Sequence, residues 1–279
     1  MFQYAAGRAL SLRRGVSHSL DISAFSHYEL HNGFELYQVF CCPSPLASEV
    51  DIRRLLGWQS SVTMQRFLRH SIFAFLRRRA LVFEPSFRYW PGIDDAPLRC
   101  YLLGYWQSEK YFQYESKTIR SDFSFKPFSA PQNRLLAERI NSEEAISLHV
   151  RRGDYVHDPK TNTTLGLCAL SYYEDAVNYI SKRVNNPSFY IFSDDPFWVR
   201  LHFDISFPCT FIEHNHGAQS FNDMHLMSLC RHHIIANSSF SWWGAWLNPR
   251  PNKIVIAPKK WFANDYSSED LLPDGWITL

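Results

Sequence analysis

The sequence predicts an α/β protein in which helices cover a parallel sheet. Two observations predict this class. Short apolar runs of strand length alternate with helical segments through the second half of the chain. The chain is 46% hydrophobic, which supplies a sizeable core, and its 279 residues suit two modest domains or one large α/β unit. No apolar run reaches the roughly 18–20 residues that a transmembrane helix needs.

Helical patterns dominate the first half. Residues 4–14 predict a helix that Gly15 stops, because glycine tolerates the positive φ of a helix end. Residues 35–40 show the only clear β alternation of this half. Two further helices are predicted, one from Ser44-Pro45 to about Gly57, with proline at its first position, and one over residues 61–82.

A loop-rich stretch separates the two halves. Residues 121–132 contain three serines and two prolines, which favour irregular structure. They predict a boundary between an N-terminal domain of residues 1–130 and a C-terminal domain of residues 131–279.

The second half alternates strands and helices. Strands are predicted over residues 145–150, 188–192, 233–236 and 253–257. Helices are predicted from a capping box at Ser171 to about Val184, from a second box at Ser220, and over residues 240–247. Ligands of such sheets bind at the carboxyl ends of the strands, near the amino ends of the helices that follow.

The charge balance excludes one class of function. The chain has 29 basic and 27 acidic residues, a net charge of +2, which argues against a dedicated nucleic-acid binder. The densest basic cluster is Arg77, Arg78 and Arg79. We favour a solvated helix end there over a site for phosphate or acidic lipid.

The cysteines indicate a reducing compartment. None of the six lies in a Cys-x-x-Cys pair, which argues against a zinc ribbon or thioredoxin chemistry. Their scatter is typical of reduced thiols, and no export signal is evident, so we expect a cytoplasmic protein.

The most specific local motif is His149-Val150-Arg151-Arg152-Gly153-Asp154, at the carboxyl end of a predicted strand. Two adjacent arginines at that position need an anionic partner, and an arginine fork can clamp a phosphate. Asp154 could orient one of them. A buried Arg–Asp pair is the equally weighted alternative.

A second motif, residues 237–244, follows the strand predicted over residues 233–236. Ser238 and Ser239 would expose hydroxyl and backbone N–H groups at a helix amino end, which suits an anion. The alternative is that one of them only caps the helix. Trp242 and Trp243 are expected to pack the helix on the sheet.

Carboxylates are also expected at this edge. Asp223 could accept hydrogen bonds from the paired N1–H and N2–H₂ donors of guanine, or it could merely complete a capping box with Ser220. Asp194 and Asp195 end another predicted strand and reach the same edge.

A metal site is not expected. The twelve histidines include His214, His216, His225 and the pair His232-His233, but their spacing does not supply three convergent ligands. No Asp-x-Asp motif, phosphate-binding P-loop or dinucleotide fingerprint occurs in the sequence.

Several motifs together resemble the α-1,2-fucosyltransferases of glycosyltransferase family 11, of bacterial type. They are HVRRGD (149–154), DMHLMSLCRHHIIANSSFSWWGAWL (223–247), KIVIAPKKWF (253–262), MFQYAAGRAL (1–10) and GYWQSEKYF (104–112). The similarity extends over nearly the whole chain.

The resemblance implies a GT-B-type fold, with two Rossmann-like domains facing a central cleft. The N-terminal domain would hold a galactoside and the C-terminal domain GDP-fucose. Arg151 resembles the pyrophosphate ligand, supported by Arg152 and Asp154. The resemblance also implies that His149 and Asp223 contact the guanine of the donor, and that Ser238 and Ser239 contact its pyrophosphate.

The implied reaction is an inverting transfer of fucose from GDP-β-L-fucose to the 2-hydroxyl of a terminal galactoside, without a metal or other cofactor. The acceptor would be a galactose-terminated glycan or a lipid-linked oligosaccharide. We therefore also expect peripheral contact with the inner face of the membrane. Asp158 and Glu109 are weak candidates for the catalytic base beside Arg151.

The start of the chain departs from the family pattern. Members usually carry a strand and a glycine-rich turn just before the MFQYA motif, whereas here Met1 begins it. The alternative function is therefore a catalytically impaired homologue that still binds a nucleotide sugar or carbohydrate. A metal-dependent hydrolase is a further competing class, which would need converging histidine and aspartate ligands.

Overall fold

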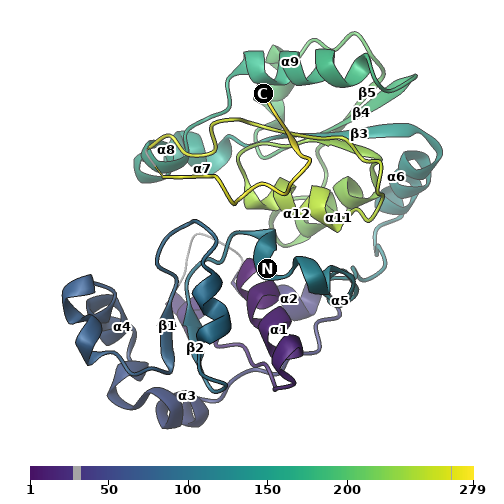
Figure 1. Ribbon diagram of the computed structural model, residues 1–279. Coiled ribbons are helices and arrows are strands. Elements are labelled where there is room, and N and C mark those ends of the chain that lie inside the picture. The colour runs from purple at the N-terminus through teal and green to yellow at the C-terminus, as the bar shows by residue number, and fades with distance from the viewer. Residues whose placement is uncertain (28–32, 265) are drawn as a thin grey trace. The chain divides into compact units, whose positions relative to one another are not determined.

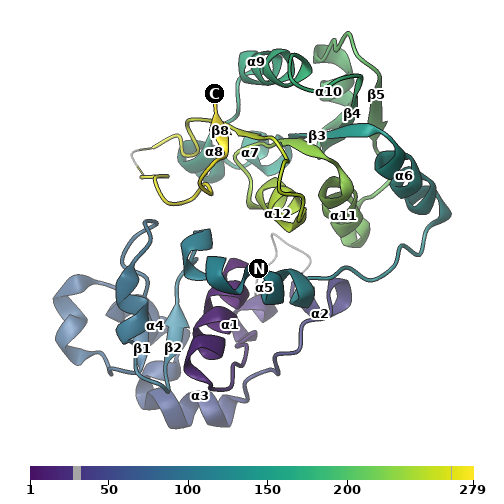
Figure 2. The same ribbon diagram turned by 45° about the vertical axis from the view of Figure 1, so that its right-hand side comes forward.

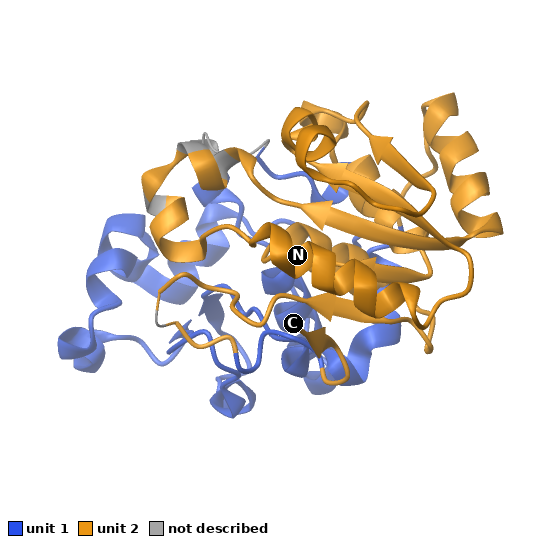
Figure 3. Cartoon of the chain, turned by 90° about the horizontal axis from the view of Figure 1, so that it is seen from above, with its two compact units in different colours: residues 1–124, 269–273 blue, residues 125–268, 274–279 orange. Residues whose placement is uncertain are grey.

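The computed structural model describes residues 1–27, 33–264 and 266–279, apart from the side chains of Asp154, His157 and Lys160. Helices and parallel strands alternate in it, which confirms the α/β class. The chain divides into two compact units, coloured separately in Figure 3. Unit 1 comprises residues 1–124 and 269–273, and unit 2 comprises residues 125–268 and 274–279.

Unit 2 is built on six parallel strands. Their order is β5-β4-β3-β6-β7-β8, so the chain builds outward from β3 in one direction and then from β6 in the other. This is the strand order of a Rossmann fold. The strands are β3 (Glu144–Val150), β4 (Pro187–Ser193), β5 (Cys209–Ile212), β6 (His232–Ile234), β7 (Val255–Ala257) and β8 (Ile277–Thr278).

Both faces of this sheet are buried. Alternate residues of a strand point to opposite faces, so Phe189 and Ile191 of β4 enter one apolar cluster while Tyr190 and Phe192 enter another. Helix α9 (Leu170–Ser181) packs on the first face, and α6 (Pro131–Ser142) and α11 (Phe221–Leu229) pack on the second (Figure 1). Double burial explains why β3 and β4 are continuous apolar runs in the sequence.

The other helices of unit 2 follow strands. They are α7 (Gly153–His157) and α8 (Pro159–Leu165) after β3, α10 (Pro196–His202) after β4, and α12 (Ser239–Leu247) after β6. Each therefore starts near the carboxyl edge of the sheet.

Unit 1 has a smaller parallel sheet of two strands, β1 (Leu81–Phe83) and β2 (Tyr101–Leu103). Its helices are α1 (Phe2–Arg14), α2 (Leu36–Val39), α3 (Glu49–Leu56), α4 (Val62–Leu68) and α5 (Ser116–Asp122). Gly15 ends α1 with φ 62°, as predicted. In Figure 1, α4 is drawn on the β1 side of this sheet and α1 on the β2 side, and Figure 2 gives a second view of the unit.

Three predictions for unit 1 are wrong. The β alternation of residues 35–40 belongs to the helix α2. Ser44-Pro45 does not start a helix, because Ser48 caps α3 by accepting a hydrogen bond from the Asp51 backbone N–H. The helix predicted over residues 61–82 ends at Leu68 and is followed by the 3₁₀ helix Ser71–Leu76 and by β1.

The long helix is interrupted for an identifiable reason. The Arg77 side chain donates from Nε to the Leu68 carbonyl at 2.7 Å and from Nη2 to the carbonyls of Arg69 and His70. The guanidinium thus satisfies carbonyls at the carboxyl end of α4, so the chain can turn there. In unit 2, α9 begins at Leu170 with Ala169 as N-cap, so the capping box predicted at Ser171 is also wrong.

A short C-terminal segment belongs to unit 1. The Asp270 carboxylate accepts a hydrogen bond from the Tyr89 backbone N–H at 2.9 Å and pairs with the Lys110 ammonium at 2.5 Å. These contacts attach residues 269–273 to elements more than 150 positions earlier in the sequence.

Candidate functional site

The carboxyl ends of β3 and β6 define the candidate site in unit 2. The two strands are neighbours, with Leu148 beside Ile234, and the order of the sheet reverses between them. Ligands of open parallel sheets bind in the crevice at such a switch point. His149, Arg151 and Arg152 come at the end of β3, and Ser238 and Ser239 follow β6, so the fold brings both motifs to this edge.

Arg151 pairs with a carboxylate from the next strand. Its Nη1 lies 3.0 Å from Oδ2 of Asp194, and each side chain is about a quarter exposed. Asp194 also accepts hydrogen bonds from the backbone N–H groups of Arg152 at 2.8 Å and Gly153 at 2.9 Å. The carboxylate thus neutralises the arginine and orders the turn after β3, while the pair keeps access to solvent.

Gly153 makes this arrangement possible. A Cβ atom at that position would lie 2.6 Å from Oδ2 of Asp194, which is closer than Cβ contacts normally come. The glycine of the HVRRGD motif therefore lets the carboxylate reach two backbone N–H groups. The side chain of Asp154 lies outside the described residues.

Arg152 contacts the protein on two sides. Its Nε lies 3.2 Å from Oδ2 of Asp195, and its guanidinium lies 3.7 Å from the ring centre of Trp198. Asp195 in turn caps α10, accepting a hydrogen bond from the Trp198 N–H at 3.1 Å. These contacts fit a supporting role for Arg152.

His149 is buried at the end of β3. Its ring lies 5.7 Å from that of Phe240, and no described residue hydrogen-bonds its Nδ1. Burial lowers the pKa of this imidazole to about 3, so it is neutral at physiological pH. A buried ring nitrogen without a partner is a polar group that a bound ligand could satisfy.

Ser238 and Ser239 form the amino end of α12. Ser238 is buried and caps the helix, its Oγ accepting a hydrogen bond from the Phe240 N–H at 3.3 Å. Ser239, the first helical residue, is exposed. Capping therefore accounts for Ser238, whereas Ser239 presents its hydroxyl to solvent at the positive end of a nine-residue helix.

Asn237, the first residue of the second motif, to which the sequence interpretation gave no role, fixes the turn before α12. Its buried amide donates to the carbonyls of Leu165, Gly166 and Trp261 at 2.8 to 3.2 Å. Its own carbonyl accepts from the Tyr155 hydroxyl at 3.0 Å. Asn237 thus joins three segments beneath the serines, and only the fold could reveal this because its partners are distant in the sequence.

Asp223 takes part in a polar cluster rather than a capping box. Its Oδ1 accepts a hydrogen bond from the Asn215 amide at 2.7 Å, and the Ser220 side chain makes no capping bond. Asn215 and Asn133 exchange amide hydrogen bonds, and Nε2 of His214 lies 2.7 Å from Oδ1 of Asn133. Burial raises the pKa of Asp223 to about 7, although the Asn215 contact opposes the shift.

The two candidate bases differ in surroundings. Asp158 caps α8, accepting hydrogen bonds from the Thr161 N–H at 3.2 Å and hydroxyl at 2.5 Å. Glu109 starts a 3₁₀ helix in unit 1 and interacts electrostatically with Arg120. A base role for either one stays a prediction.

The carboxyl edge of the small sheet in unit 1 has its own polar centre. Glu84 follows β1, and its buried carboxylate accepts hydrogen bonds from the backbone N–H groups of Tyr105 at 2.6 Å and Trp106 at 2.9 Å. Burial raises the pKa of this carboxyl. A Cβ atom at Gly104 would lie 2.3 Å from Cβ of Glu84, so glycine is needed after β2.

This turn is unusual in two respects. Trp106 has φ 57° although it is not a glycine, and no described residue hydrogen-bonds its buried indole N–H. Beside it, the exposed ring of Tyr105 stacks on Phe87 at 5.6 Å and 23°. Gln3 of α1 donates to the Gly104 carbonyl at 2.7 Å, which joins the MFQYA and GYWQSEKYF motifs.

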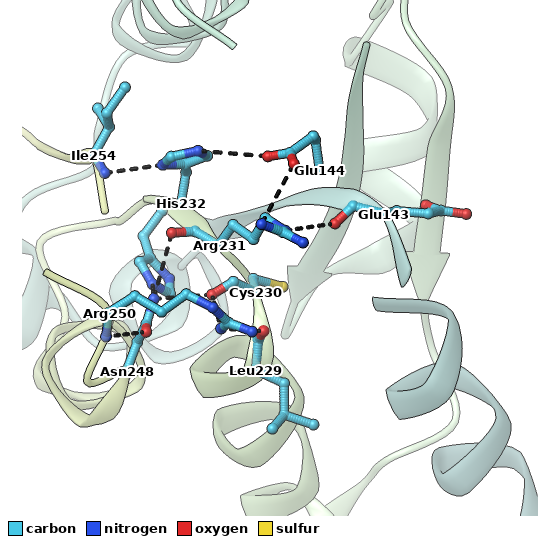
Figure 4. A network of polar contacts seen from close by, with 10 residues as sticks. Glu143, Glu144, Leu229, Cys230, Arg231, His232, Asn248, Arg250 and Ile254 are labelled. Carbon is cyan, nitrogen blue, oxygen red and sulfur yellow. Dashed lines mark hydrogen bonds and ion pairs between the residues drawn. The ribbon is translucent and has the colours of Figure 1, made fainter. Parts of the chain in front are cut away.

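Basic residues also gather at the opposite, amino end of the large sheet (Figure 4). Arg250 donates to the Leu229 carbonyl at 2.9 Å, and Arg231 donates to the Glu143 carbonyl at 3.1 Å. Lys253 likewise binds the carbonyls of Ala245 and Asn248. These cations line a hollow of about 360 Å³, but they bind carbonyls at helix ends, which is a structural role.

The histidines are distributed over separate contacts. His225 is stacked between Phe125 and Phe128, with ring centres 4.3 and 3.9 Å away. His233 lies between the Ser147 hydroxyl at 2.8 Å and the Asn248 amide at 2.9 Å. Within the described part of the chain, no three His, Cys, Asp or Glu side chains are grouped so as to hold a metal ion.

A Rossmann-ordered sheet with an arginine and a helix amino end at its switch point is the arrangement of nucleotide-binding α/β proteins. The family model described as glycosyl transferase family 11 matches residues 94–279. The chain therefore belongs to glycosyltransferase family 11, which confirms the resemblance seen in the motifs.

Several curated proteins are similar to this chain. The alpha-1,2-colitosyltransferase of Escherichia coli is 35% identical, covering 100% of this chain and 94% of that protein. The O-antigen biosynthesis glycosyltransferase WbnK of Escherichia coli is 31% identical, covering 100% and 96%. The galactoside 2-alpha-L-fucosyltransferase SEC1 of Bos taurus is 28% identical, but it aligns with only 59% of this chain and 45% of its own length.

Proposed function

We propose that this chain transfers L-fucose from GDP-β-L-fucose to the 2-hydroxyl of a terminal β-galactoside on a glycan. Membership of family 11 supports the reaction, as do the names of the relatives, which include an α-1,2 transferase and a galactoside fucosyltransferase. The observation that carries the proposal is the meeting of Arg151 and the amino end of α12 at the switch point of the unit 2 sheet.

The chemistry requires a site for a departing diphosphate. In a single displacement, the galactose 2-oxygen bonds to the fucose anomeric carbon, the bond from that carbon to the β-phosphate oxygen breaks, and the 2-hydroxyl proton passes to a base. GDP leaves with the bonding electrons, so charge develops on the pyrophosphate. Arg151 and the N–H groups at Ser239 stabilise that charge, and attack opposite a β-linked leaving group gives the α product.

Recognition of guanine is assigned to Asp223 and His149. An ionised Asp223 accepts two hydrogen bonds from N1–H and N2–H₂, and no other base offers this pair of donors at that edge. The unpartnered Nδ1 of His149 supplies a further polar contact. A galactose-terminated surface polysaccharide is the proposed acceptor, and the name of the O-antigen relative supports this class.

A second donor is favoured by one observation. The relative named colitosyltransferase aligns with the whole chain at 35% identity. Colitose is L-fucose without its 3-hydroxyl, so the two donors differ by a single polar group. A site that hydrogen-bonds the 3-hydroxyl would reject colitose strongly, whereas a site that leaves it in solvent would accept both.

The test is a paired transfer assay. The full chain is incubated with lactose and either GDP-fucose or GDP-colitose, and the product linkage is read by nuclear magnetic resonance. We expect an α-1,2-linked product, with GDP-fucose as the better donor. A preference for GDP-colitose would replace fucose in the proposal. Tight GDP binding with neither product nor donor hydrolysis would instead favour the impaired homologue.

A further inference from the structure

A segment of unit 1 combines exposed apolar side chains with arginines. Between Asp51 and Glu84 the sequence contains seven arginines and no aspartate, glutamate or lysine. The same stretch presents six large apolar side chains to solvent, with Ile72 73% and Phe75 81% exposed. The exposed apolar residues are Trp58, Val62, Phe67, Ile72, Phe75 and Leu76.

The exposure is built into the local structure. Buried Leu56, Leu68 and Leu81 form the core beneath this segment. The buried Gln59 side chain donates to the Leu76 carbonyl at 2.7 Å and accepts from the Arg78 N–H at 3.0 Å, so it fixes the end of the 3₁₀ helix. Residues 71–76 are thus held in place while none of their side chains is buried.

The arginines divide into two groups. Arg77 is used internally, because it binds carbonyls at the end of α4 and lies 4.8 Å from the ring centre of Phe83. Arg66 and Arg79 are exposed and form no ion pair with any described residue. Among the described residues, Arg66 and Arg79 therefore contribute positive charge that no ion pair neutralises.

We propose that residues 57–79 bind the surface of a membrane rich in anionic lipid. An interfacial segment needs apolar side chains that enter the acyl boundary and cations that meet the headgroups, and this segment has both. Ile72, Phe75 and Leu76 insert, while Arg66, Arg69 and Arg79 contact phosphate groups. Half of the exposed apolar residues, Val62, Ile72 and Leu76, are aliphatic and give a base no ring to stack on, which argues against nucleic acid.

This surface differs from a membrane span. Among the helices that the structure describes, none is both long and apolar enough to cross a bilayer. The proposed contact is peripheral and partly electrostatic, so it weakens as salt screens the charges. It adopts the acidic-lipid alternative to the solvated helix end that the sequence favoured at Arg77–Arg79.

Vesicle sedimentation tests the proposal with the full chain. We expect co-sedimentation with vesicles of phosphatidylglycerol and phosphatidylcholine at 50 mM salt, and a loss of roughly tenfold or more with phosphatidylcholine alone or at 500 mM salt. The double variant I72S/F75S, and separately R66Q/R79Q, should each reduce binding at least about fivefold. Thermal melting of each variant confirms that it still folds.

Matched controls come from unit 2. Phe197 and Leu201 are exposed apolar residues, and Lys182 and Arg183 are exposed cations, so F197S/L201S and K182Q/R183Q should bind vesicles like the original chain. Equal binding to neutral vesicles, or equal losses in the controls, would overturn the proposal. The proposal would also be overturned if the chain bound no vesicles but self-associated, and I72S/F75S abolished that self-association. This face would then be an interface between copies of the chain.

Discussion

The Arg151 guanidinium lies 3.0 Å from the Asp194 carboxylate, at the ends of the adjacent strands β3 and β4. The same carboxylate binds two backbone N–H groups of the turn that follows Arg151. One acidic side chain thus sets both the direction of the arginine and the shape of its turn, so substitutions at Arg151 and at Asp194 test different functions.

Replacing Arg151 tests the pyrophosphate contact. The variant Arg151→Lys keeps the charge but loses the planar fork, so kcat/KM for fucose transfer should fall about 100-fold or more, equivalent to about 3 kcal/mol. Arg183→Lys is the control and should leave kcat/KM unchanged, because Arg183 is exposed and lies just before β4, at the amino edge of the sheet. Near-original turnover in Arg151→Lys would make the arginine structural.

Replacing Asp194 tests positioning. Asp194→Asn removes a charge that three donors share, so unfolding should become about 1–3 kcal/mol easier. The KM for the donor should also rise, because Arg151 loses the partner that orients it. Thermal melting measures the change in stability, and initial rates at a series of GDP-fucose concentrations measure the KM for the donor. A lower melting temperature with an unaltered donor KM would limit Asp194 to holding the turn.

The raised pKa of Asp223 predicts a pH dependence. Between pH 3.8 and about 7 the folded chain keeps a proton that the unfolded chain has lost, so the free energy of unfolding should decrease as pH rises through this range. Guanine needs the ionised carboxylate, so GDP should bind more tightly as pH rises from 6 to 8. Calorimetric titration at both pH values checks this.

The variant Asp223→Asn supplies the comparison for that titration. It should lose the pH dependence of GDP affinity and reduce the preference for GDP over UDP by roughly 10–100-fold, since a neutral amide cannot pair with both donors of guanine. An unchanged GDP-to-UDP affinity ratio in the variant would remove Asp223 from the nucleotide site.

The absence of an Asp-x-Asp motif predicts metal independence. Transfer should proceed at its full rate after treatment with EDTA, because cationic side chains and backbone N–H groups stabilise the negative charge on the departing GDP. The assay is the initial rate before and after chelation. A complete loss that Mn²⁺ or Mg²⁺ restores would contradict the prediction.

The turn after β2 predicts an acceptor contact. If the Tyr105–Phe87 pair supports the apolar face of a galactoside, Tyr105→Ala should raise the acceptor KM about 5–10-fold without altering GDP affinity. Tyr105→Phe keeps the ring and should behave like the original. Tyr114, which is exposed in the same unit, provides the matched control Tyr114→Ala. Equal effects at both positions would assign the loss to general surface changes.

The sequence predicts four of the six strands of unit 2, β3, β4, β6 and β7, and misses β5 and β8, which lie at the two edges of the sheet. β3 and β4 are apolar runs buried on both faces, and each is followed by polar residues at the carboxyl edge of the sheet. The position of Arg151 after such a strand is therefore visible without a structure. Its pairing with Asp194 is not, because that contact depends on the register between β3 and β4.

The first half resists prediction for the opposite reason. Helix α2 has four residues and β1 and β2 have three each, so none is long enough to show a period. Helix α4 ends where the Arg77 side chain reaches back nine positions, a tertiary effect that spacing cannot reveal. Glu84 and Trp106 were missed because only the pairing of β1 with β2 brings them together.

Asp270 bears on how hybrid enzymes of this family could be assembled. Consider a hybrid that takes residues 1–124 from one homologue and the rest from another, in order to exchange acceptor specificity. Its first part would lack its own Asp270, the carboxylate that binds Lys110 and the Tyr89 backbone N–H. Residues 269–273 would then come from the wrong parent and face a mismatched surface. A working hybrid would have to take two separate pieces of sequence, residues 1–124 and residues 269–273, from the same parent enzyme.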